Sequence, residues 1–219
     1  MLVDAARRAG VRDERVLAAL TATPRAGFVP PSLAAQADVD VPLPIAHRQV
    51  TTQPSLVARM VEALRLRGDE RVLEVGTGLG YQTALLARLA GHVWTVERWP
   101  DLVDAARGNL AADGVENVDL VCGDGTRGLP EHAPFDANVL AAAFPRVPPP
   151  LAEQLARSGR LVQPIGPGGD EDVMAFTRTQ AGIAPCARVT RAHFVRLYGE
   201  HGYRAGRMFW LTRKRFSGS

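Results

Sequence analysis

A glycine-rich segment, Gly76-Thr-Gly-Leu-Gly80, constrains the fold of this chain more than any other feature. It follows the strand-like run Val72–Val75 and precedes residues 81–89, whose apolar side chains recur at helical spacing. Glycines at such a turn permit positive φ angles and let the backbone approach a ligand closely. A strand, a glycine turn and a helix in this order are typical of an open α/β sheet, which binds ligands at the carboxyl ends of its strands.

The rest of the chain alternates short apolar runs with stretches of helical periodicity. We expect strands at residues 71–75, 92–97, 118–122, 135–141 and 160–165, and helices at residues 54–64, 81–89, 102–112 and 150–156. Two late, antiparallel strands are expected at residues 173–178 and 194–197. This order predicts an α/β fold: a Rossmann-like, doubly wound and mostly parallel sheet with helices on both faces.

A single domain with three parts is predicted for the 219 residues. Residues 1–54 would form an N-terminal helix (1–23) and a proline-rich lid over substrate and cofactor. Residues 55–199 would form the cofactor-binding core, and residues 200–219 a basic tail. The tail carries Arg204, Arg207, Arg213, Lys214 and Arg215. We interpret it as a solvated terminal face, with a nucleic-acid-binding patch as the less favoured alternative.

Composition places the chain among globular proteins, with 46% hydrophobic and 22% charged residues. No apolar run approaches the roughly 20 residues that cross a bilayer, and the charged N-terminal segment does not resemble a signal peptide. We therefore expect a cytoplasmic protein with no membrane or nucleic-acid partner. Nothing in the sequence demands an oligomer, so a monomer is expected.

Cysteines and histidines do not form a metal-binding pattern. Cys122 and Cys186 lie far apart and have no nearby cysteine partner, which excludes a disulfide framework and a cysteine zinc site. We expect both to be buried, reduced thiols. None of the five histidines has partners at metal-ligand spacing, so no metal is predicted. His47, in the lid, is interpreted as a surface residue rather than a substrate contact.

The glycine segment departs from the dinucleotide-binding pattern GxGxxG. Its third glycine comes one residue early, and Tyr81 occupies the required position. Glu74 precedes the loop, where a carboxylate would repel a pyrophosphate but attract an ammonium group. The segment therefore favours a nucleoside with a cationic amino-acid tail, and S-adenosylmethionine fits that description.

Two further acidic residues stand at predicted strand ends. Glu97 follows the loop by about 20 residues, where a carboxylate can accept from both ribose hydroxyls. Asp124 follows the third predicted strand and could accept from an adenine amino group, while Gly125 leaves room for the ring. Three strand-end acids in this order strengthen the prediction of a nucleoside cofactor.

At these residues the chain resembles the protein-L-isoaspartate O-methyltransferase family. The resemblance covers residues 25–199 and is most specific in a stretch before the first helix of the core. The residues that carry it are Phe28-Val29-Pro30, Asp40-x-Pro-Leu-Pro-Ile45, Gln49-x-x-x-Gln53-Pro54, Glu74-Val-Gly-Thr-Gly-Leu-Gly-Tyr-Gln-Thr83, Gly123-Asp-Gly125, Pro134-Phe-Asp-Ala137, Gly159-Arg-Leu-Val162 and Phe194-Val195.

The resemblance implies a carboxyl O-methyltransferase. Such an enzyme uses S-adenosyl-L-methionine, releases S-adenosyl-L-homocysteine, and methylates the α-carboxylate of an L-isoaspartyl residue in a protein or peptide. The methyl ester then collapses to a succinimide that can reopen to aspartate. A carboxylate is already ionised at neutral pH, so the reaction needs no general base, and positioning should dominate.

The resemblance also implies roles for individual residues. Thr52 stands where the family has a serine, and we assign it the catalytic positioning role. The predicted cofactor-binding residues are Thr51, Thr52, Gln53, Glu74, Gly76, Thr77, Gly78, Gly80, Gln82, Glu97, Arg98, Asp124 and Gly125. The predicted substrate-binding residues are Ile45, Ala46, Arg48, Val195 and Arg196.

The substrate side departs from the family pattern. Ala46-His47-Arg48 stands where the family commonly has Gly-x-Gly, Arg146 where it often has an acid, and Arg196 where it has a proline. The three arginines could clamp carboxylates or lie solvated at the surface. We hypothesise that the cofactor half is intact and the substrate half has diverged.

Other functions stay open. One alternative is a relative that methylates an aspartyl carboxylate in a dedicated natural-product precursor peptide. Another is a catalytically silent module that binds S-adenosylmethionine and a partner protein. An RNA methyltransferase is the least favoured, because residues 141–145 read Ala-Ala-Ala-Phe-Pro and offer no aromatic base clamp of the Asn-Pro-Pro-Tyr kind.

Overall fold

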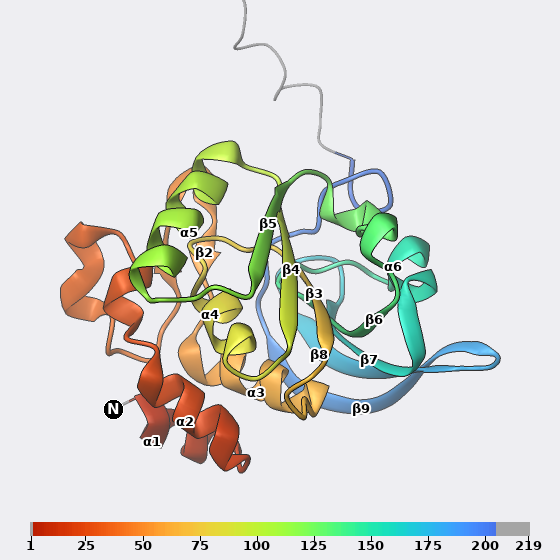
Figure 1. Cartoon of the computed structure of the whole chain (residues 1–219), viewed down its shortest axis with the longest axis horizontal. Coiled ribbons are helices and arrows are strands. Elements are labelled where there is room, and N and C mark those ends of the chain that lie inside the picture. The colour runs from red at the N-terminus through yellow and green to blue at the C-terminus, as the bar shows by residue number, and fades with distance from the viewer. Residues whose placement is uncertain (1, 205–219) are drawn as a thin grey trace, which may run out of the picture.

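The computed structural model of the chain describes residues 2–204 and is built around a seven-stranded sheet (Figure 1). The strand order is β5-β4-β3-β6-β7-β8-β9. The strands are β3 (Arg71–Val75), β4 (His92–Glu97), β5 (Val118–Cys122), β6 (Phe135–Leu140), β7 (Leu155–Ile165), β8 (Glu171–Thr179) and β9 (Gly182–Ala192). Strands β3 to β7 pair in parallel, and β8 and β9 extend the sheet antiparallel. The predicted Rossmann-like, mostly parallel α/β sheet is confirmed.

Helices cover both faces of the sheet, because successive side chains of a strand point to opposite sides. Val72 of β3 belongs to the larger hydrophobic cluster, and its neighbour Leu73 belongs to the second cluster, with Leu151 of the opposite helix layer. The α-helices are α1 (Leu2–Arg8), α2 (Glu14–Ala22), α3 (Pro54–Leu64), α4 (Tyr81–Ala87), α5 (Pro100–Ala112) and α6 (Pro149–Glu153). Short 3-10 helices are η1 (Arg25–Phe28), η2 (Pro31–Gln36), η3 (Ala46–Arg48), η4 (Gly125–Arg127) and η5 (Pro130–His132).

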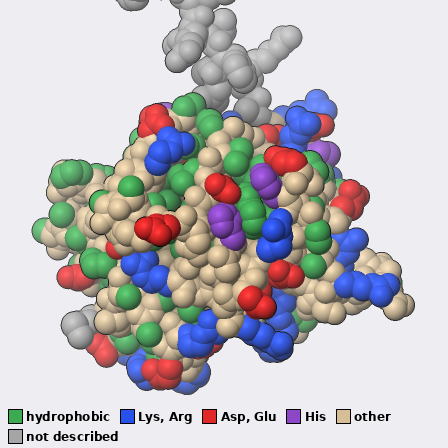
Figure 2. Space-filling model, in the orientation of Figure 1, with side chains coloured by type: hydrophobic (Ala, Val, Ile, Leu, Met, Phe, Trp, Pro, Cys, Tyr) green, Lys and Arg blue, Asp and Glu red, His purple; other side chains and the backbone are tan. Residues whose placement is uncertain are grey.

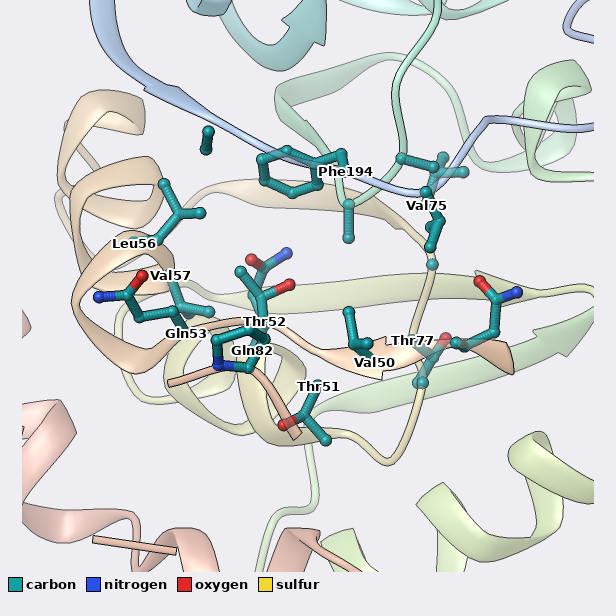
Figure 3. A pocket seen from close by; sticks show the side chains of 18 of the residues that line it. Val50, Thr51, Thr52, Gln53, Leu56, Val57, Val75, Thr77, Gln82 and Phe194 are labelled. Carbon is teal, nitrogen blue, oxygen red and sulfur yellow. The ribbon is translucent and has the colours of Figure 1, made fainter. Parts of the chain in front are cut away.

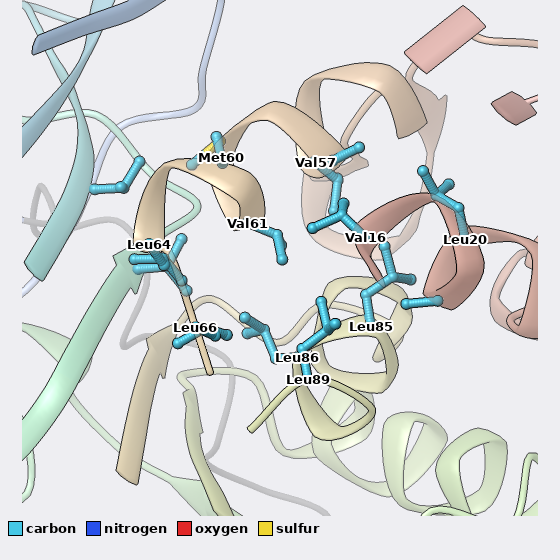
Figure 4. Packing of buried hydrophobic residues seen from close by; sticks show 14 of the residues in the cluster. Val16, Leu20, Val57, Met60, Val61, Leu64, Leu66, Leu85, Leu86 and Leu89 are labelled. Atoms are coloured by element: carbon cyan, nitrogen blue, oxygen red, sulfur yellow. The ribbon is translucent and has the colours of Figure 1, made fainter. Parts of the chain in front are cut away.

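Helix α3 anchors the N-terminal part of the chain to the sheet. Its buried residues Val57, Met60, Val61 and Leu64 follow helical spacing. Figure 4 shows this helix facing residues of α2 and α4. The labelled residues of this cluster are Val16, Leu20, Val57, Met60, Val61, Leu64, Leu66, Leu85, Leu86 and Leu89. Because α3 begins directly after the predicted lid, this packing fixes one end of the lid.

The predicted lid contains a short hairpin. Strand β1 (Leu43–Pro44) pairs antiparallel with β2 (Val50–Thr51), and η3 lies between them. His47 and Arg48 in η3 have φ angles of 58° and 57°. A side chain in this left-handed region costs about 1 kcal/mol or more per residue. The turn of the lid is therefore held by contacts that offset this strain.

The predicted single helix over residues 1–23 is wrong. The chain forms two helices, because Gly10 turns with a φ of 104°. Asp13 then caps α2 by accepting a hydrogen bond from the Arg15 amide at 2.8 Å. Glu62 of α3 accepts from the amides of Arg12 and Asp13, at 2.6 and 2.7 Å, so the break between the helices is tied to the core.

Two further expectations need correction, and one strand was missed. Strand β7 begins at Leu155, inside the predicted helix 150–156, because α6 ends at Glu153. Residues 194–197 form an isolated bridge between Arg196 and Ala143 rather than a strand. The long strand β9 was not predicted. It is an edge strand whose side chains are mostly exposed or half-buried, so its sequence lacks the apolar alternation of a core strand.

The two cysteines are exposed, contrary to the prediction that they are buried. Cys122 lies on β5 and Cys186 on β9, which are the two edges of the sheet. Edge strands have fewer neighbours than central strands. Position in the sheet therefore overrides the general preference of cysteine for burial.

The surface of the protein carries charges of both signs. Acidic and basic side chains are interspersed on the face shown in Figure 2. Within residues 2–204, no helix is long and apolar enough to cross a membrane. Of the predicted basic tail, Arg204 is described and exposed, whereas Arg207, Arg213, Lys214 and Arg215 lie outside the described residues.

Candidate active site

A cavity of about 700 Å³ opens at the carboxyl ends of β3 and β4. Four segments that are distant in sequence form its wall: residues 49–53 of the lid, residues 75–79 of the glycine loop, residues 96–99 and residues 190–198. Figure 3 shows Thr52 and Gln53 of the lid, Thr77 of the glycine loop and Phe194 around one space. Ligand binding at this edge of the sheet is what the glycine loop predicts.

The glycine loop takes the backbone shape that only glycine adopts readily. Gly76 and Gly78 have φ angles of 97° and 56°. A Cβ on Gly76 would lie 3.3 Å from the Cβ of Ala141, and a Cβ on Gly125 would overlap Val75 Cγ1. The missing side chains at Gly76 and Gly125 therefore let Ala141 and Val75 pack directly against this backbone.

Glu97 ends β4 at the cavity wall and is nearly buried. Its carboxylate accepts hydrogen bonds from three amides: Gly78 at 3.0 Å, Arg98 at 2.8 Å and Trp99 at 3.1 Å. Burial raises the pKa of Glu97, and these hydrogen bonds partly oppose the shift. The amides of Arg98 and Trp99 both donate to Oε1, whereas Oε2 accepts only from Gly78. Oε2 therefore keeps one lone pair, so Glu97 can accept one further hydrogen bond while it holds the glycine loop in place.

Glu74 does not line the cavity, because its side chain is fully buried, and its predicted contact with the cofactor stays a prediction. Its carboxylate accepts from Gln82 Nε2 at 2.9 Å, Thr83 Oγ1 at 2.5 Å and Thr95 Oγ1 at 2.7 Å. Thr95 in turn is 2.6 Å from the hydroxyl of Thr77. Since Gln82 and Thr77 line the cavity, Glu74 acts on the site through them.

The lid carries Thr51, Thr52 and Gln53 to the cavity. Gln53 Nε2 donates to Asp40 Oδ2 at 2.9 Å, and the other oxygen of Asp40 accepts from the Ser55 amide at 2.8 Å. These bonds fix the chain on the C-terminal side of Thr52. Thr52 itself is half-buried, so its hydroxyl is available to a ligand.

The tip of the lid is attached to helix α5. The His47 ring stacks on Trp99 with centroids 3.9 Å apart, and its Nε2 lies 2.8 Å from both carboxylate oxygens of Asp101. This hydrogen bond is the main cause of the lowered pKa of Asp101. On the cavity side, the Arg98 guanidinium lies over the rings of Trp99 and Tyr198, at 5.1 and 5.5 Å. His47 therefore attaches the turn of the predicted lid to the start of α5, and it does not line the cavity.

The opposite end of the cavity is basic. Its wall includes Arg59, Arg191, His193 and Arg196, with Asp170 as the acidic residue of that end. Asp170 pairs with Arg191 at 3.3 Å. Arg196 donates to the Pro167 carbonyl at 3.1 Å and stays exposed. A carboxylate ligand would meet an excess of positive charge there.

Asp124 lies beside a second cavity of about 480 Å³ rather than in this one. Its Oδ1 accepts from the amide and hydroxyl of Thr126, at 2.9 and 2.7 Å, and its Oδ2 accepts from the Glu200 amide at 2.7 Å. Residues 199–201 thus cover Asp124. Its predicted contact with adenine stays a prediction.

Most predicted residues meet at the cavity wall. Those that line it are Ile45, Thr51, Thr52, Gln53, Gly76, Thr77, Gly78, Gln82, Glu97, Arg98, Gly125, Val195 and Arg196. Besides Glu74 and Asp124, three do not: Gly80 precedes α4 and packs on Leu110, while Ala46 and Arg48 lie in the turn of the lid. The roles of those three stay predictions.

Sequence reasoning missed several wall residues, chiefly Leu79, Trp99, Leu102, Ala141, Ala142, Phe194 and Tyr198. Trp99 had one signal, its place directly after the predicted cofactor residues Glu97 and Arg98. Phe194 had one as well, because it directly precedes the predicted Val195 in a stretch that carries the family resemblance. Tyr198 had none, because it reaches the cavity through a non-local return of the chain. The described residues contain no group of three or more histidine, cysteine or carboxylate side chains that could hold a metal.

Comparison with known proteins agrees with this geometry. The sequence pattern of the family described as protein-L-isoaspartate(D-aspartate) O-methyltransferase matches residues 1–202. A protein-L-isoaspartate O-methyltransferase of Methanoculleus marisnigri is 48% identical over 199 residues, 90% of this chain and 89% of that protein. The enzyme of the same name from Anaeromyxobacter dehalogenans strain 2CP-C is 53% identical over 190 residues, 86% of this chain and 91% of that protein.

Solved structures are similar in fold. A protein-L-isoaspartate O-methyltransferase superposes with a TM-score of 0.78 at 27% identity, covering 92% of this chain and 66% of that one. A Plasmodium falciparum structure, described as a putative enzyme of this type in complex with S-adenosyl-L-homocysteine, has a TM-score of 0.76 at 24% identity and covers 90% and 96% of the two chains.

The glycine loop, the strand-end Glu97 and the Rossmann-like sheet define a methyltransferase that uses S-adenosylmethionine. The length and identity of the matches narrow the class further. The chain belongs to the protein-L-isoaspartate(D-aspartate) O-methyltransferase family. The predicted family, enzyme type and cofactor are confirmed.

Proposed function

We propose that this protein methylates the α-carboxylate of L-isoaspartyl residues in damaged proteins and peptides, as a general repair enzyme. The observation that carries the proposal is one continuous cavity that joins Glu97 and the glycine loop to Thr52 and to a basic end. The part of the cavity at Glu97 and the glycine loop suits a nucleoside. The part at Thr52 and the basic end suits a carboxylate. No acid–base pair is needed, because the reacting carboxylate is already ionised at neutral pH.

The residues present fit the cofactor. Gly76 and Gly125 present backbone without a side chain at the cavity wall, and Oε2 of Glu97 keeps one lone pair there. We assign Thr51, Gln53, Thr77, Gly78, Gln82 and Arg98 to the same cofactor surface. When bound, S-adenosylmethionine supplies a methyl group on an activated sulfonium.

On the substrate side, Thr52 holds the reacting carboxylate. Its hydroxyl donates a hydrogen bond to one carboxylate oxygen and so orients the other toward the methyl donor. Ile45 and Val195 flank that position, and Arg196 attracts the negative charge from the rim. Closure of the lid excludes water, which strengthens each of these interactions.

The working unit that we propose is a cytoplasmic monomer without nucleic-acid or membrane partners. Residues 1–54 serve as N-terminal helices and lid, and residues 55–199 as the cofactor-binding core. Residues 200–203, predicted to belong to the tail, pack on that core through Glu200, His201 and Tyr203. The interspersed charges in Figure 2 support a surface without a nucleic-acid tract on that face.

A matched peptide pair tests this function. The protein is incubated with S-adenosylmethionine and either an isoaspartyl peptide or its aspartyl counterpart, and products are followed by mass spectrometry. We expect a methyl gain on the isoaspartyl peptide alone, followed by loss of methanol to a succinimide. Methylation of neither peptide, with cofactor binding shown separately by calorimetry, would contradict general repair.

A second candidate is a relative with one dedicated peptide substrate. The lid favours it, because Arg48 occupies a left-handed conformation where glycine is typical of the family, and His47 beside it is left-handed too. A lid made rigid at this cost suits a single partner better than many. Methylation of several unrelated isoaspartyl peptides with similar kcat/KM would exclude this candidate.

Arg196 gives a separate prediction for substrate binding. Arg196→Ala is expected to raise the KM for the isoaspartyl peptide by about fivefold with little change in kcat, because an exposed charge contributes up to about 1 kcal/mol. Arg107→Ala, which removes an exposed arginine on α5 that pairs with Asp104, is the control. Equal KM values for the Arg196→Ala variant and the unmodified protein would exclude the rim contact.

A further inference from the structure

Arg25 is a buried arginine without a carboxylate partner. The side chain is 1% exposed, and no acid among residues 2–204 lies within ion-pair distance of it. Burial lowers its pKa, with attraction from Tyr81 and Asp40 partly opposing the shift. Burying a charge without an ion-pair partner costs several kcal/mol unless hydrogen bonds satisfy it, so the acceptors around this guanidinium are held close to it.

Its donors connect two segments of the lid. Nη1 donates to the carbonyls of Val39 at 3.0 Å and Ala37 at 3.4 Å, and Nη2 donates to the Val41 carbonyl at 2.9 Å. Nη2 also donates to Thr51 Oγ1 at 2.7 Å, the shortest of these bonds, and to the Thr52 carbonyl at 3.4 Å. One planar side chain therefore ties residues 37–41 to the cavity threonines.

The surrounding contacts show why this matters for Thr52. Thr51 pairs with Leu43 across the lid hairpin, and Asp40, within the tied segment, holds Gln53 and Ser55. The chain is thus fixed on both sides of Thr52, by Arg25 before it and by Asp40 after it. Arg25 does not line the cavity, so it acts on the site through the backbone that it holds.

We propose that Arg25 is a positioning residue for methyl transfer: its guanidinium fork sets the placement of Thr51 and Thr52 in the cavity. This inference rests on the proposed role of Thr52. A lysine keeps the charge but presents a single nitrogen, which cannot reach both segments as the fork does. A shift of the threonines by a fraction of an ångström changes the rate of a reaction that depends on orientation.

The test compares Arg25→Lys with Arg178→Lys. Arg178 is the matched control, because its guanidinium also donates to three carbonyls, those of Ala152, Glu153 and Leu155, at a place away from the cavity wall. Arg25→Lys is expected to lower kcat for the isoaspartyl peptide at least about tenfold. Affinity for S-adenosyl-L-homocysteine should fall less than kcat, by about threefold or less, because Thr51 is one of several cofactor contacts and Glu97 and the glycine loop stay in place.

Two measurements distinguish a failure of the Arg25 proposal from a failure of the proposed isoaspartyl methyltransferase function. Hydrogen exchange of peptides within residues 37–53 is expected to accelerate in Arg25→Lys and not in Arg178→Lys, whether or not the chosen peptide is a substrate. Millimolar guanidinium is expected to restore part of the kcat of Arg25→Ala. Unchanged kcat and exchange in Arg25→Lys, or equal losses in both lysine variants, would overturn the inference. If the unmodified protein does not methylate the isoaspartyl peptide, but Arg25→Lys still accelerates hydrogen exchange of residues 37–53, the result contradicts the proposed function and leaves the structural role of Arg25 intact.

Discussion

Glu97→Ala is expected to weaken S-adenosyl-L-homocysteine binding at least about 100-fold, a loss of about 3 kcal/mol. Two effects combine in this variant. The carboxylate that we assign to the ribose hydroxyls is removed, and hydrogen bonds to charged groups contribute about 1.5–3 kcal/mol. The amides of Gly78, Arg98 and Trp99 also lose their acceptor, which releases the loop that forms the cavity wall.

Calorimetric titration measures this effect directly. Glu97→Gln keeps one carbonyl oxygen, so its affinity for S-adenosyl-L-homocysteine is expected to fall about tenfold. This places it between the unmodified protein and the alanine variant. Asp119→Ala is the control for folding, since Asp119 is an exposed acid on β5 that pairs with His92. Binding by Glu97→Ala within about threefold of the unmodified protein would show that the cofactor uses another acceptor.

The sequence predicted the sheet and the glycine loop because both are local signals. Strands such as β3 and β4 are apolar runs between helices, and positive φ at Gly76 follows from the glycine itself. The sequence could not separate Glu74 from Glu97. Both are acids at strand ends, but Gln82 and Thr83 of the returning helix α4 enclose Glu74, and that packing is set by tertiary structure.

Local sequence patterns could not predict the far wall of the cavity either, because tertiary structure brings its residues to the site. Phe194 and Tyr198 come after the sheet has been completed, and they return to the carboxyl ends of strands formed about a hundred residues earlier. Arg25 gave no sequence signal either, because its partners are mainly backbone carbonyls. Every residue has a backbone carbonyl, so the sequence does not show which carbonyls an arginine contacts. The role of Arg25 therefore becomes visible only in the folded structure.

Glu74 makes the stability of the fold depend on pH. Burial raises its pKa to about 7, although hydrogen bonds from Thr83, Thr95 and Gln82 oppose the shift. In the unfolded chain a glutamate has a pKa of about 4.3. The folded protein therefore binds the Glu74 proton more tightly, so this contribution to stability is complete below about pH 4 and is lost as the pH rises through 7.

The expected loss between pH 4 and pH 8 is about 3 kcal/mol in the free energy of unfolding. It is measured by urea unfolding of the unmodified protein and of Glu74→Gln, whose side chain does not titrate. The comparison is needed because burial also raises the pKa of Glu97, and that contribution is common to both proteins. The difference in stability between the two should change by about 3 kcal/mol across this range, in favour of Glu74→Gln at high pH. Parallel pH profiles would mean that the three donors keep Glu74 ionised in the fold, and its role would then be to orient Gln82 and Thr77 as a fixed charge.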